Sequence, residues 1–268
     1  MNNDKFFETN KAHWNERVSI HKTTDLYALE DFKKGKNKLH PLEISELGDI
    51  KGKSILHLQC HFGMDTLSLE MLGAKVTGVD FSEEAIKAAM ELRDELGMNA
   101  DFILSDVYSL PELLNKKFDI VYTSYGVLLW LPDLDKWAGV VKNFMKDDGF
   151  FYIAEVHPTS MLFDYSNNEN DLKVLYPYFS QSAPLLFNEP GTYADKTVET
   201  KNNITYEWVH SLSDIFMSII NAGLKIEFFH EHHFTVWQQF SWMKKGEDGL
   251  FRMPNEIPLI FSLKAVNA

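Results

Sequence analysis

The chain has 268 residues, 45% of them hydrophobic, so it can bury one substantial core or a core with a cap. Its formal net charge of −13 argues against a nucleic-acid partner, because such a partner requires a basic face. The absence of an 18-residue apolar run argues against a membrane span, and a single cysteine favours a reducing, cytoplasmic setting.

The N-terminal region shows a helical pattern over residues 1–30, with Trp14 on its apolar side. We expect residues 1–50 to form a helical lid over a ligand site, the alternative being helices that simply pack on a sheet. A short helix is predicted from His40 to Leu47. The basic run Lys33–Lys38 is expected to be a solvated loop.

The next stretch predicts a strand, a tight turn, a helix and a second strand. Ser54–Leu58 is short and apolar, Gly63 occupies the turn, and Met64–Leu72 has apolar residues at helical spacing. Lys75–Val79 is rich in β-branched residues and is followed by Asp80. This arrangement is typical of the nucleotide-binding corner of a doubly wound sheet.

The residues of the turn indicate which kind of cofactor the site can bind. A dinucleotide site requires G-x-G-x-x-G, whereas the turn here is Gln59-Cys60-His61-Phe62-Gly63 and keeps one glycine. It is a poor pyrophosphate cradle, which disfavours a nicotinamide-dependent oxidoreductase, but it suits a ligand without phosphate such as S-adenosylmethionine. The oxygens of Asp80 can accept both ribose hydroxyls, and Asp106, which ends the next strand, can accept from the adenine amino group.

Alternating helices and strands continue to residue 156, which predicts parallel strands joined by right-handed crossovers. Ser82 is expected to cap the first of these helices. The predicted elements are a helix over Glu83–Leu96, a strand over Phe102–Asp106, a short helix over Leu110–Leu114, a strand over Phe118–Ser124, a helix over Asp133–Met145 and, after a turn at Asp147-Asp148-Gly149, a strand over Phe150–Val156.

After this point the regular alternation breaks. Residues 158–205 lack clear periodicity and are expected to form an insertion, a hairpin-bearing substrate cap. Residues 206–268 then return to the core, with a helix over Asp214–Asn221 and strands over Leu224–Phe229 and Ile257–Ala265. Residues 51–157 would form the cofactor-binding core.

Four motifs in order carry a family resemblance: Ile55–Gly63, Val79–Ser82, Ser105-Asp106 and Phe118–Ser124. With them the chain resembles the class I S-adenosylmethionine-dependent methyltransferases, and its first motif resembles a bacterial small-molecule branch. The resemblance implies an α/β, Rossmann-like, doubly wound sheet of seven mostly parallel strands, the last antiparallel and inserted beside the fifth. It also implies methyl transfer by in-line displacement onto a small-molecule acceptor, with S-adenosylhomocysteine as product.

The resemblance also implies which residues bind the cofactor. His57 stands where the family has an acid that helps to hold the methionine amino group, and Gln59 and His61 stand where it has glycine. These departures keep open the alternative of a non-catalytic S-adenosylmethionine-binding protein of the same fold. The expected cofactor-binding residues are His57, Gln59, His61, Gly63, Asp80, Phe81, Ser105, Asp106, Val107 and Ser124.

A general base helps only if the acceptor is an O–H or N–H group of high pKa. The candidates are His157 at the end of the fifth strand, Tyr193 in the insertion and His21 in the lid; packing or a loop hydrogen bond is the alternative for each. His230 and His232 share a strand face, but two imidazoles make a poor zinc site, so no metal is expected. The expected partner is a small-molecule acceptor, without nucleic acid or membrane, for a monomer or homodimer.

Overall fold

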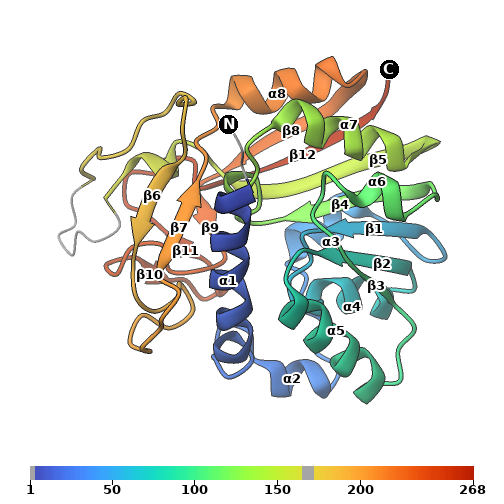
Figure 1. The fold of residues 1–268 in the computed structure, drawn as a ribbon, viewed down its shortest axis with the longest axis horizontal. Helices are drawn as coiled ribbons and strands as arrows, with labels where there is room; N and C mark the ends of the chain where they lie inside the picture. The colour runs from blue at the N-terminus through green and yellow to red at the C-terminus, as the bar shows by residue number, and fades with distance from the viewer. Residues whose placement is uncertain (1–3, 165–171) are drawn as a thin grey trace.

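The computed structural model describes residues 4–164 and 172–268 (Figure 1). Its helices are α1 (Asp4–His21), α2 (Leu29–Lys33), α3 (Pro41–Leu47), α4 (Met64–Met71), α5 (Glu83–Glu95), α6 (Leu110–Leu113), α7 (Leu134–Phe144) and α8 (Leu212–Asn221), with 3-10 turns at Leu128–Trp130 and Ser160–Leu162. Its strands are β1 (Ser54–Leu58), β2 (Lys75–Asp80), β3 (Asp101–Leu104), β4 (Phe118–Ser124), β5 (Met145–Val156), β6 (Leu185–Asn188), β7 (Ile204–Glu207), β8 (Leu224–His232), β9 (Phe234–Thr235), β10 (Lys244–Lys245), β11 (Phe251–Arg252) and β12 (Ile260–Asn267).

The central sheet has seven strands in the order β3-β2-β1-β4-β5-β12-β8. The strands from β3 to β5 are parallel, and β12 is antiparallel to both β5 and β8. This confirms the fold class expected from the sequence, including a last strand inserted beside the fifth. The strand order reverses between β1 and β4, and open α/β sheets bind ligands in the crevice beyond the strand ends at such a point.

Successive residues of a strand face opposite sides, so both faces of the sheet are covered. Leu56 and Leu58 of β1 pack in the cluster that includes α7 and α8. Ile55, which directly precedes Leu56, packs on the other side with residues of α3 and α4. The runs of apolar residues read from the sequence therefore fill two buried layers, as expected for strands with both faces buried.

Helix α1 stands between the central sheet and the small strands β6, β7 and β9–β11 (Figure 1). On the core side, the Oγ of Ser82 donates to the Oδ1 of Asn15 at 2.6 Å, at the start of α5. On the other side, Asn10 exchanges two hydrogen bonds with the backbone of Tyr206, at 2.8 and 2.9 Å. Because α5 begins at the carboxyl end of β2, α1 lies over that edge of the sheet.

The segments after β5 differ most from expectation. β6 pairs antiparallel with β7, which fits the expected hairpin, but residues 165–171 of the expected insertion lie outside the described residues. A small sheet in the order β10-β11-β9 was missed, because two-residue strands have no readable period. Within the described ranges, no helix is both long and apolar enough to span a bilayer.

Two strand boundaries need correction. β5 begins at Met145, directly after α7, rather than at Phe150, and an irregularity in its pairing with β4 accommodates the residues that suggested a turn. β8 continues beyond Phe229 to His232, because β12 pairs with it along this length.

Candidate active site

The expected cofactor residues come together where the carboxyl ends of β1 to β4 meet. Gly63 follows β1, Asp80 ends β2, Ser105 to Val107 follow β3 and Ser124 ends β4. The strand order places β1 and β4 side by side at the reversal point. The four motifs therefore surround one crevice of the sheet.

Asp80 is the best-defined polar group of this edge. Its Oδ2 accepts from the backbone N–H of His61 at 2.8 Å, and its Oδ1 accepts from the N–H of Ser82 at 2.9 Å. Burial raises the pKa of Asp80 to about 6, and these backbone donors oppose the rise. A carboxylate oxygen has more than one lone pair, so each oxygen can accept a further hydrogen bond from a diol.

Gly63 is required by the packing around it. It adopts φ +79, and a Cβ at this position would lie 2.7 Å from ring atoms of Phe102 and 2.9 Å from the Cβ of Ala89. Only glycine meets both demands, because other residues rarely adopt this backbone conformation and would collide here. The one glycine that the first motif retains is thus at the position where backbone conformation and packing both require it.

The two large residues in place of glycine hold left-handed backbone conformations. Gln59 has φ 56 and His61 has φ 49. The side chain of Gln59 donates to the carbonyl of Val127 at 2.9 Å and so joins the ends of β1 and β4. Strained non-glycine residues cluster at functional sites, where the surrounding structure holds them in place.

The loop after β4 is held by Glu155 of β5. The carboxylate of this buried residue accepts from the backbone N–H groups of Gly126, Val127 and Leu128, the last two at 2.8 and 3.1 Å. Burial raises the pKa of Glu155, and these N–H donors oppose the rise. Tyr125, which precedes the loop, has φ 39. Glu155 therefore positions the loop that faces the crevice.

After β3, the chain bends around Asp106. Its Oδ1 accepts from the backbone N–H groups of Tyr108 and Ser109, at 2.9 and 3.0 Å. Ser105 is nearly buried and donates to the carbonyl of Asp106 at 2.7 Å, and Val107 packs in the core. Asp106 thus stands beyond β3 with its backbone fixed by local hydrogen bonds.

Three further expected residues differ in placement. His57 is buried within β1, where its Nδ1 lies 2.9 Å from the Oγ1 of Thr66, and burial lowers its pKa to about 3. Phe81 is half-buried beside Asp80, and Ser124 is nearly buried at the end of β4. His57 lies deeper in the sheet than the other members of the set.

Aromatic and imidazole side chains cover the first-motif turn. The Nδ1 of His21 lies 2.9 Å from the Nε2 of His61, and the ring centroid of Trp14 lies 5.3 Å from that of His61. The hydroxyl groups of Tyr27 and Tyr193 hydrogen-bond to each other. Residues from the N-terminal region and from the insertion therefore meet above the edge that carries Asp80.

The three candidate bases do not form one group. His21 and Tyr193 lie together, with ring centroids 4.9 Å apart. The Nδ1 of His157 accepts from the N–H of Thr159, in the turn after β5, at 3.1 Å, and its Nε2 lies 3.1 Å from Glu231 of β8. The structure therefore brings two of the candidates to the covered turn and leaves His157 apart; the role of each stays a prediction.

Proton affinity distinguishes these candidates further. Burial lowers the pKa of His21 to about 3, and nearby Arg17 and His13 add to this. Desolvation of the hydroxyl end raises the pKa of Tyr193 to about 12, although almost half of its side chain remains exposed. At neutral pH His21 is a weak base and Tyr193 keeps its proton.

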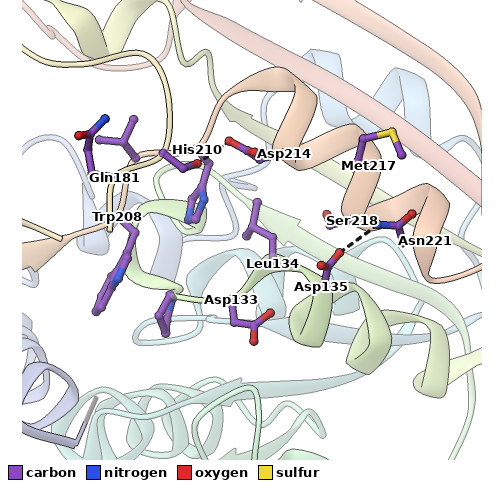
Figure 2. Close-up of a pocket in the computed structure, with 13 residues that line it drawn as sticks. Asp133, Leu134, Asp135, Gln181, Trp208, His210, Asp214, Met217, Ser218 and Asn221 are labelled. Carbon is purple, nitrogen blue, oxygen red and sulfur yellow. Dashed lines mark hydrogen bonds between the residues drawn. The ribbon is translucent and has the colours of Figure 1, made fainter. Parts of the chain in front are cut away.

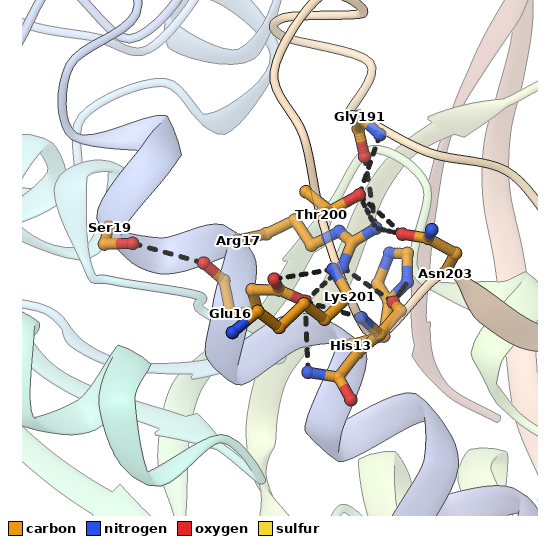
Figure 3. A network of polar contacts seen from close by, with 9 residues as sticks. His13, Glu16, Arg17, Ser19, Gly191, Thr200, Lys201 and Asn203 are labelled. Atoms are coloured by element: carbon orange, nitrogen blue, oxygen red, sulfur yellow. Dashed lines mark hydrogen bonds and ion pairs between the residues drawn. The ribbon is translucent and has the colours of Figure 1, made fainter.

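A buried arginine, which sequence reasoning missed, fastens α1 to the insertion (Figure 3). Arg17 is 1% exposed. Its Nη1 donates to the carbonyl of Asn202 at 2.7 Å, and its Nη2 donates to the carbonyl of Gly191 at 3.1 Å and to the side chains of Thr200 and Asn203, both at 3.3 Å. No local pattern distinguishes Arg17 from a solvated helix residue, because these four partners are all distant in sequence.

A pocket of about 310 Å³ lies elsewhere, between the start of α7, the residues after β7 and α8 (Figure 2). Asp133, Trp208, His210 and Asp214 help to line it. The hydroxyl of Tyr108 donates to the carbonyl of Asp133 at 3.0 Å, so the pocket adjoins the segment after β3. The described residues that line it include no site residue predicted from the sequence.

The C-terminal histidines have structural partners. The Nδ1 of His230 lies 2.7 Å from the Oε1 of Glu46, and the Nε2 of His232 lies 3.1 Å from the Oγ of Ser262. In the part of the chain that the structure describes, no group of three or more His, Cys, Asp or Glu residues is arranged to hold a metal ion. These contacts join β8 to α3 and β12.

Comparison with known proteins extends these observations. A family model described as a methyltransferase domain matches residues 50–210. A ubiquinone biosynthesis O-methyltransferase from Glaesserella parasuis is 28% identical over 134 residues, which cover 46% of this chain and 55% of that protein. The chain thus spans about half the length of the curated relatives it matches.

Solved structures share the fold at low sequence identity. An S-adenosylmethionine-dependent methyltransferase from Mesorhizobium loti gives a TM-score of 0.60 at 18% identity, covering 87% of this chain and 99% of its own. One from Clostridium acetobutylicum gives 0.57 at 18% identity, covering 96% and 98%. At such identities the likeness shows the fold.

Proposed function

The chain belongs to the methyltransferase-domain family, and from this premise we propose that it transfers a methyl group from S-adenosylmethionine to a small-molecule acceptor. S-adenosylmethionine supplies an electrophilic methyl group on a sulfonium centre. A nucleophile held in line with that methyl group reacts largely through positioning. The protein's part is to bind, orient and exclude water.

The observation that carries the proposal is the geometry of Asp80. Its carboxylate is 7% exposed, stands at the end of β2, and keeps one backbone donor on each oxygen. A ribose diol offers two hydroxyl donors that match its remaining acceptor positions. Asp106 beyond β3 is then placed to accept from the adenine amino group, and Gly63 with the adjoining backbone to receive the methionine end.

The fit to a cofactor without phosphate rests on the first-motif turn. The side chains of Gln59 and His61 occupy the turn where a pyrophosphate would need bare backbone. Gln59 is engaged with Val127 and His61 with His21, so both side chains have partners of their own. This arrangement supports S-adenosylmethionine over a dinucleotide.

The proposal also assigns roles to the covering segments. Residues 1–50 act as a helical lid, 51–157 as the cofactor-binding core, 158–205 as a substrate cap and 206–268 as the segment that completes the core sheet with β8 and β12 and also carries the small sheet of β9–β11. The bonds from Arg17 to Gly191 and Asn202 support this division, because they would make the lid and the cap move together. A covered site also favours methyl transfer by keeping water away.

A small-molecule acceptor is supported by two lines of evidence. The relative from Glaesserella parasuis is named as an O-methyltransferase of ubiquinone biosynthesis, and the net charge of −13 disfavours a nucleic-acid acceptor. In addition, Trp14, Tyr27 and Tyr193 cover the site, and such a cover favours a compact acceptor over a folded macromolecule.

The test combines binding with turnover. Wild-type protein is titrated with S-adenosylhomocysteine and then incubated with radiolabelled S-adenosylmethionine and a panel of hydroxyl and amine compounds. Cofactor binding with methyl transfer to a panel member supports the proposal. Binding without transfer over a broad panel would favour the non-catalytic alternative, and binding of NAD in place of S-adenosylhomocysteine would favour an oxidoreductase.

A further inference from the structure

Strand β6 is the outer strand of the two-stranded sheet in the cap. It pairs antiparallel with β7, and β7 lies between β6 and α1 (Figure 1). Its residues, Leu185–Asn188, are all uncharged. An uncharged edge strand with exposed apolar side chains is a template for pairing with another chain.

The hydrogen-bond pattern shows which backbone groups of β6 face outward. Hydrogen-bonded and non-hydrogen-bonded residue pairs alternate along an antiparallel ladder. The N–H of Glu189 donates to the carbonyl of Asn203 at 3.1 Å, so the neighbouring pair of Asn188 and Ile204 is of the non-hydrogen-bonded kind. The same holds two residues earlier, at Leu186. The N–H and C=O groups of Leu186 and Asn188 therefore point away from β7.

The two outer edges of this sheet differ. On β7, the N–H and C=O of Tyr206 are both bonded to the side chain of Asn10, at 2.9 and 2.8 Å. On β6, no described residue provides a hydrogen-bond partner for the outward groups of Leu186 and Asn188. Helix α1 thus closes one edge, whereas the other edge can accept a further strand.

Strand β8, at the edge of the central sheet, shows how this chain protects an edge. Its exposed side chains include Lys225, Glu227 and Glu231. Charged side chains on an edge strand oppose pairing with a second chain. On β6, the exposed residues are Leu186, which is 60% exposed, and Asn188. The protection seen on β8 is therefore not repeated on β6.

Further apolar side chains are exposed beside β6. The ring centroid of Phe187 lies 5.4 Å from that of Tyr176, and the two residues that precede Tyr176, Val174 and Leu175, are both exposed. Ile204 of β7 is exposed as well. A partner that covers these side chains removes apolar surface from water, which favours association.

The distribution of charge favours a second copy of the chain at this surface. The formal net charge of the chain is −13, but residues 172–206 contain three lysines and three acidic residues, so this segment is neutral. Two acidic molecules repel each other, and the repulsion is weakest where both surfaces are neutral. The cap is therefore the part of the chain on which two copies approach most readily.

Docking of an acidic copy on the basic run Lys33–Lys38 is disfavoured. Lys33 pairs with Glu95 at 2.9 Å. Lys38 is half-buried, with its Nζ donating to the carbonyl of Leu26 at 3.0 Å, which corrects the expectation that the whole basic run is solvated. These lysines are engaged within the chain, so the run offers less free charge to a partner.

We propose that β6 is a dimerisation strand, which pairs antiparallel with β6 of a second copy of this chain across a two-fold axis. Both subunits offer the same edge, so the contact is self-complementary. With Leu186 opposite Asn188 of the partner subunit, the two residues exchange N–H···O bonds in both directions, and Phe187 lies on the two-fold axis. The result is one continuous sheet in the order β7-β6-β6-β7. The inference does not depend on the proposed methyl transfer.

The proposed interface adjoins the segment that fastens the lid. The connection from β6 to β7 contains Gly191 and Asn202, whose carbonyls accept from Arg17. It also contains Tyr193, whose hydroxyl bonds to that of Tyr27. Pairing of β6 holds the base of this connection in both subunits.

Sedimentation velocity over a series of protein concentrations tests the dimer. The wild type should pass from monomer to dimer as its concentration rises. Leu186→Pro removes an outward N–H that β7 does not use, and should raise the dissociation constant of the dimer by about 10- to 100-fold. Leu186→Lys should also weaken the dimer, because it places a charge on the edge. The matched control is Leu113→Lys on α6, where the native side chain is 62% exposed, and it should dimerise as the wild type does.

Amide hydrogen exchange locates the contact. As the concentration of the wild type rises, the N–H groups of Leu186 and Asn188 should exchange more slowly, whereas those of Phe187 and Glu189, which face β7, should not change. Slow exchange of Phe187 and Glu189 in Leu186→Pro shows that the hairpin still forms; if it is lost, Leu186→Lys decides. A wild type that is monomeric at every concentration, including one that binds phosphatidylcholine vesicles instead, overturns the proposal. So does a dimer that persists in the Leu186 variants, or one in which exchange at Leu186 and Asn188 does not depend on concentration.

Discussion

The imidazole rings of His21 and His61 meet at 2.9 Å, and this contact joins the last residue of α1 to the turn whose backbone holds Asp80. His21 is fully buried, and beyond His61 its ring packs between Tyr27 and Tyr193. Helix α1 and the first-motif turn are thus linked through a pair of neutral histidines.

The burial of His21 makes the stability of the protein depend on pH. The pKa of His21 is lowered to about 3 in the folded state, below its ordinary value of 6.5. As pH falls, the unfolded chain therefore takes up a proton on His21 before the folded protein does. The stabilising contribution of the neutral, buried His21 is complete above pH 6.5. It is lost as pH falls toward about 3, at up to about 1.4 kcal/mol per pH unit. His21→Phe should reduce this acid slope in urea unfolding and speed hydrogen exchange in α1; the half-exposed control His230→Phe should do neither.

The buried Glu43 of α3 predicts the opposite dependence of stability on pH. Its folded-state pKa of about 8 lies above the ordinary 4.5, so its contribution is complete below pH 4.5 and is lost as pH rises toward 8. Between pH 6.5 and 8 the wild type should lose stability relative to Glu43→Gln, by up to about 1.4 kcal/mol per pH unit. Urea unfolding at several pH values measures the difference. Parallel curves for the two proteins would mean that Glu43 is ionised at neutral pH.

Arg17 is predicted to fasten the lid. Arg17→Met removes the donors to Gly191, Asn202 and Thr200 and should lower the free energy of unfolding by about 2–4 kcal/mol. Limited proteolysis should then cut more readily between residues 189 and 203. The control is Lys36→Met, because among the described residues the exposed ammonium of Lys36 pairs only with Asp31, at 3.4 Å, and its loss should be nearly neutral. Equal effects in the two variants would show that the network contributes little.

We predict that alanine is tolerated at position 97 but not at position 63. Both adopt positive φ, +79 and +63, but a Cβ on Gly63 would meet Phe102 and Ala89 while one on Gly97 meets open space. Gly97→Ala should cost about 1 kcal/mol of stability through its backbone alone. Gly63→Ala should cost about 2–4 kcal/mol and abolish cofactor binding. A similar loss of stability in the two variants would contradict the claim that steric crowding requires glycine at position 63.

The central fold was predictable from sequence because its signals are local. Apolar strands of five to seven residues, a capping Ser82 and an acid at the end of β2 repeat the pattern of a doubly wound sheet, and the structure contains that sheet. The point at which the strand order reverses, between β1 and β4, is seen only in the structure. Most of the residues that we propose for cofactor binding were predictable for the same reason, since they lie at or after strand ends.

The parts that were missed depend on contacts between distant segments. Arg17 and Glu43 look like solvated helix residues until Asn202 and Tyr122, each more than 75 positions away, are placed beside them. The strands β9–β11 are too short for periodicity to reveal.

The most direct test of cofactor binding is a calorimetric titration of wild-type protein and Asp80→Asn with S-adenosylhomocysteine. Wild-type affinity should be constant at neutral pH and fall as Asp80 is protonated below about pH 6. Asp80→Asn should bind about 10- to 100-fold more weakly and lose that pH dependence. No binding by the wild type, or equal affinity in Asp80→Asn, would contradict the assignment of the crevice at Asp80 to S-adenosylmethionine.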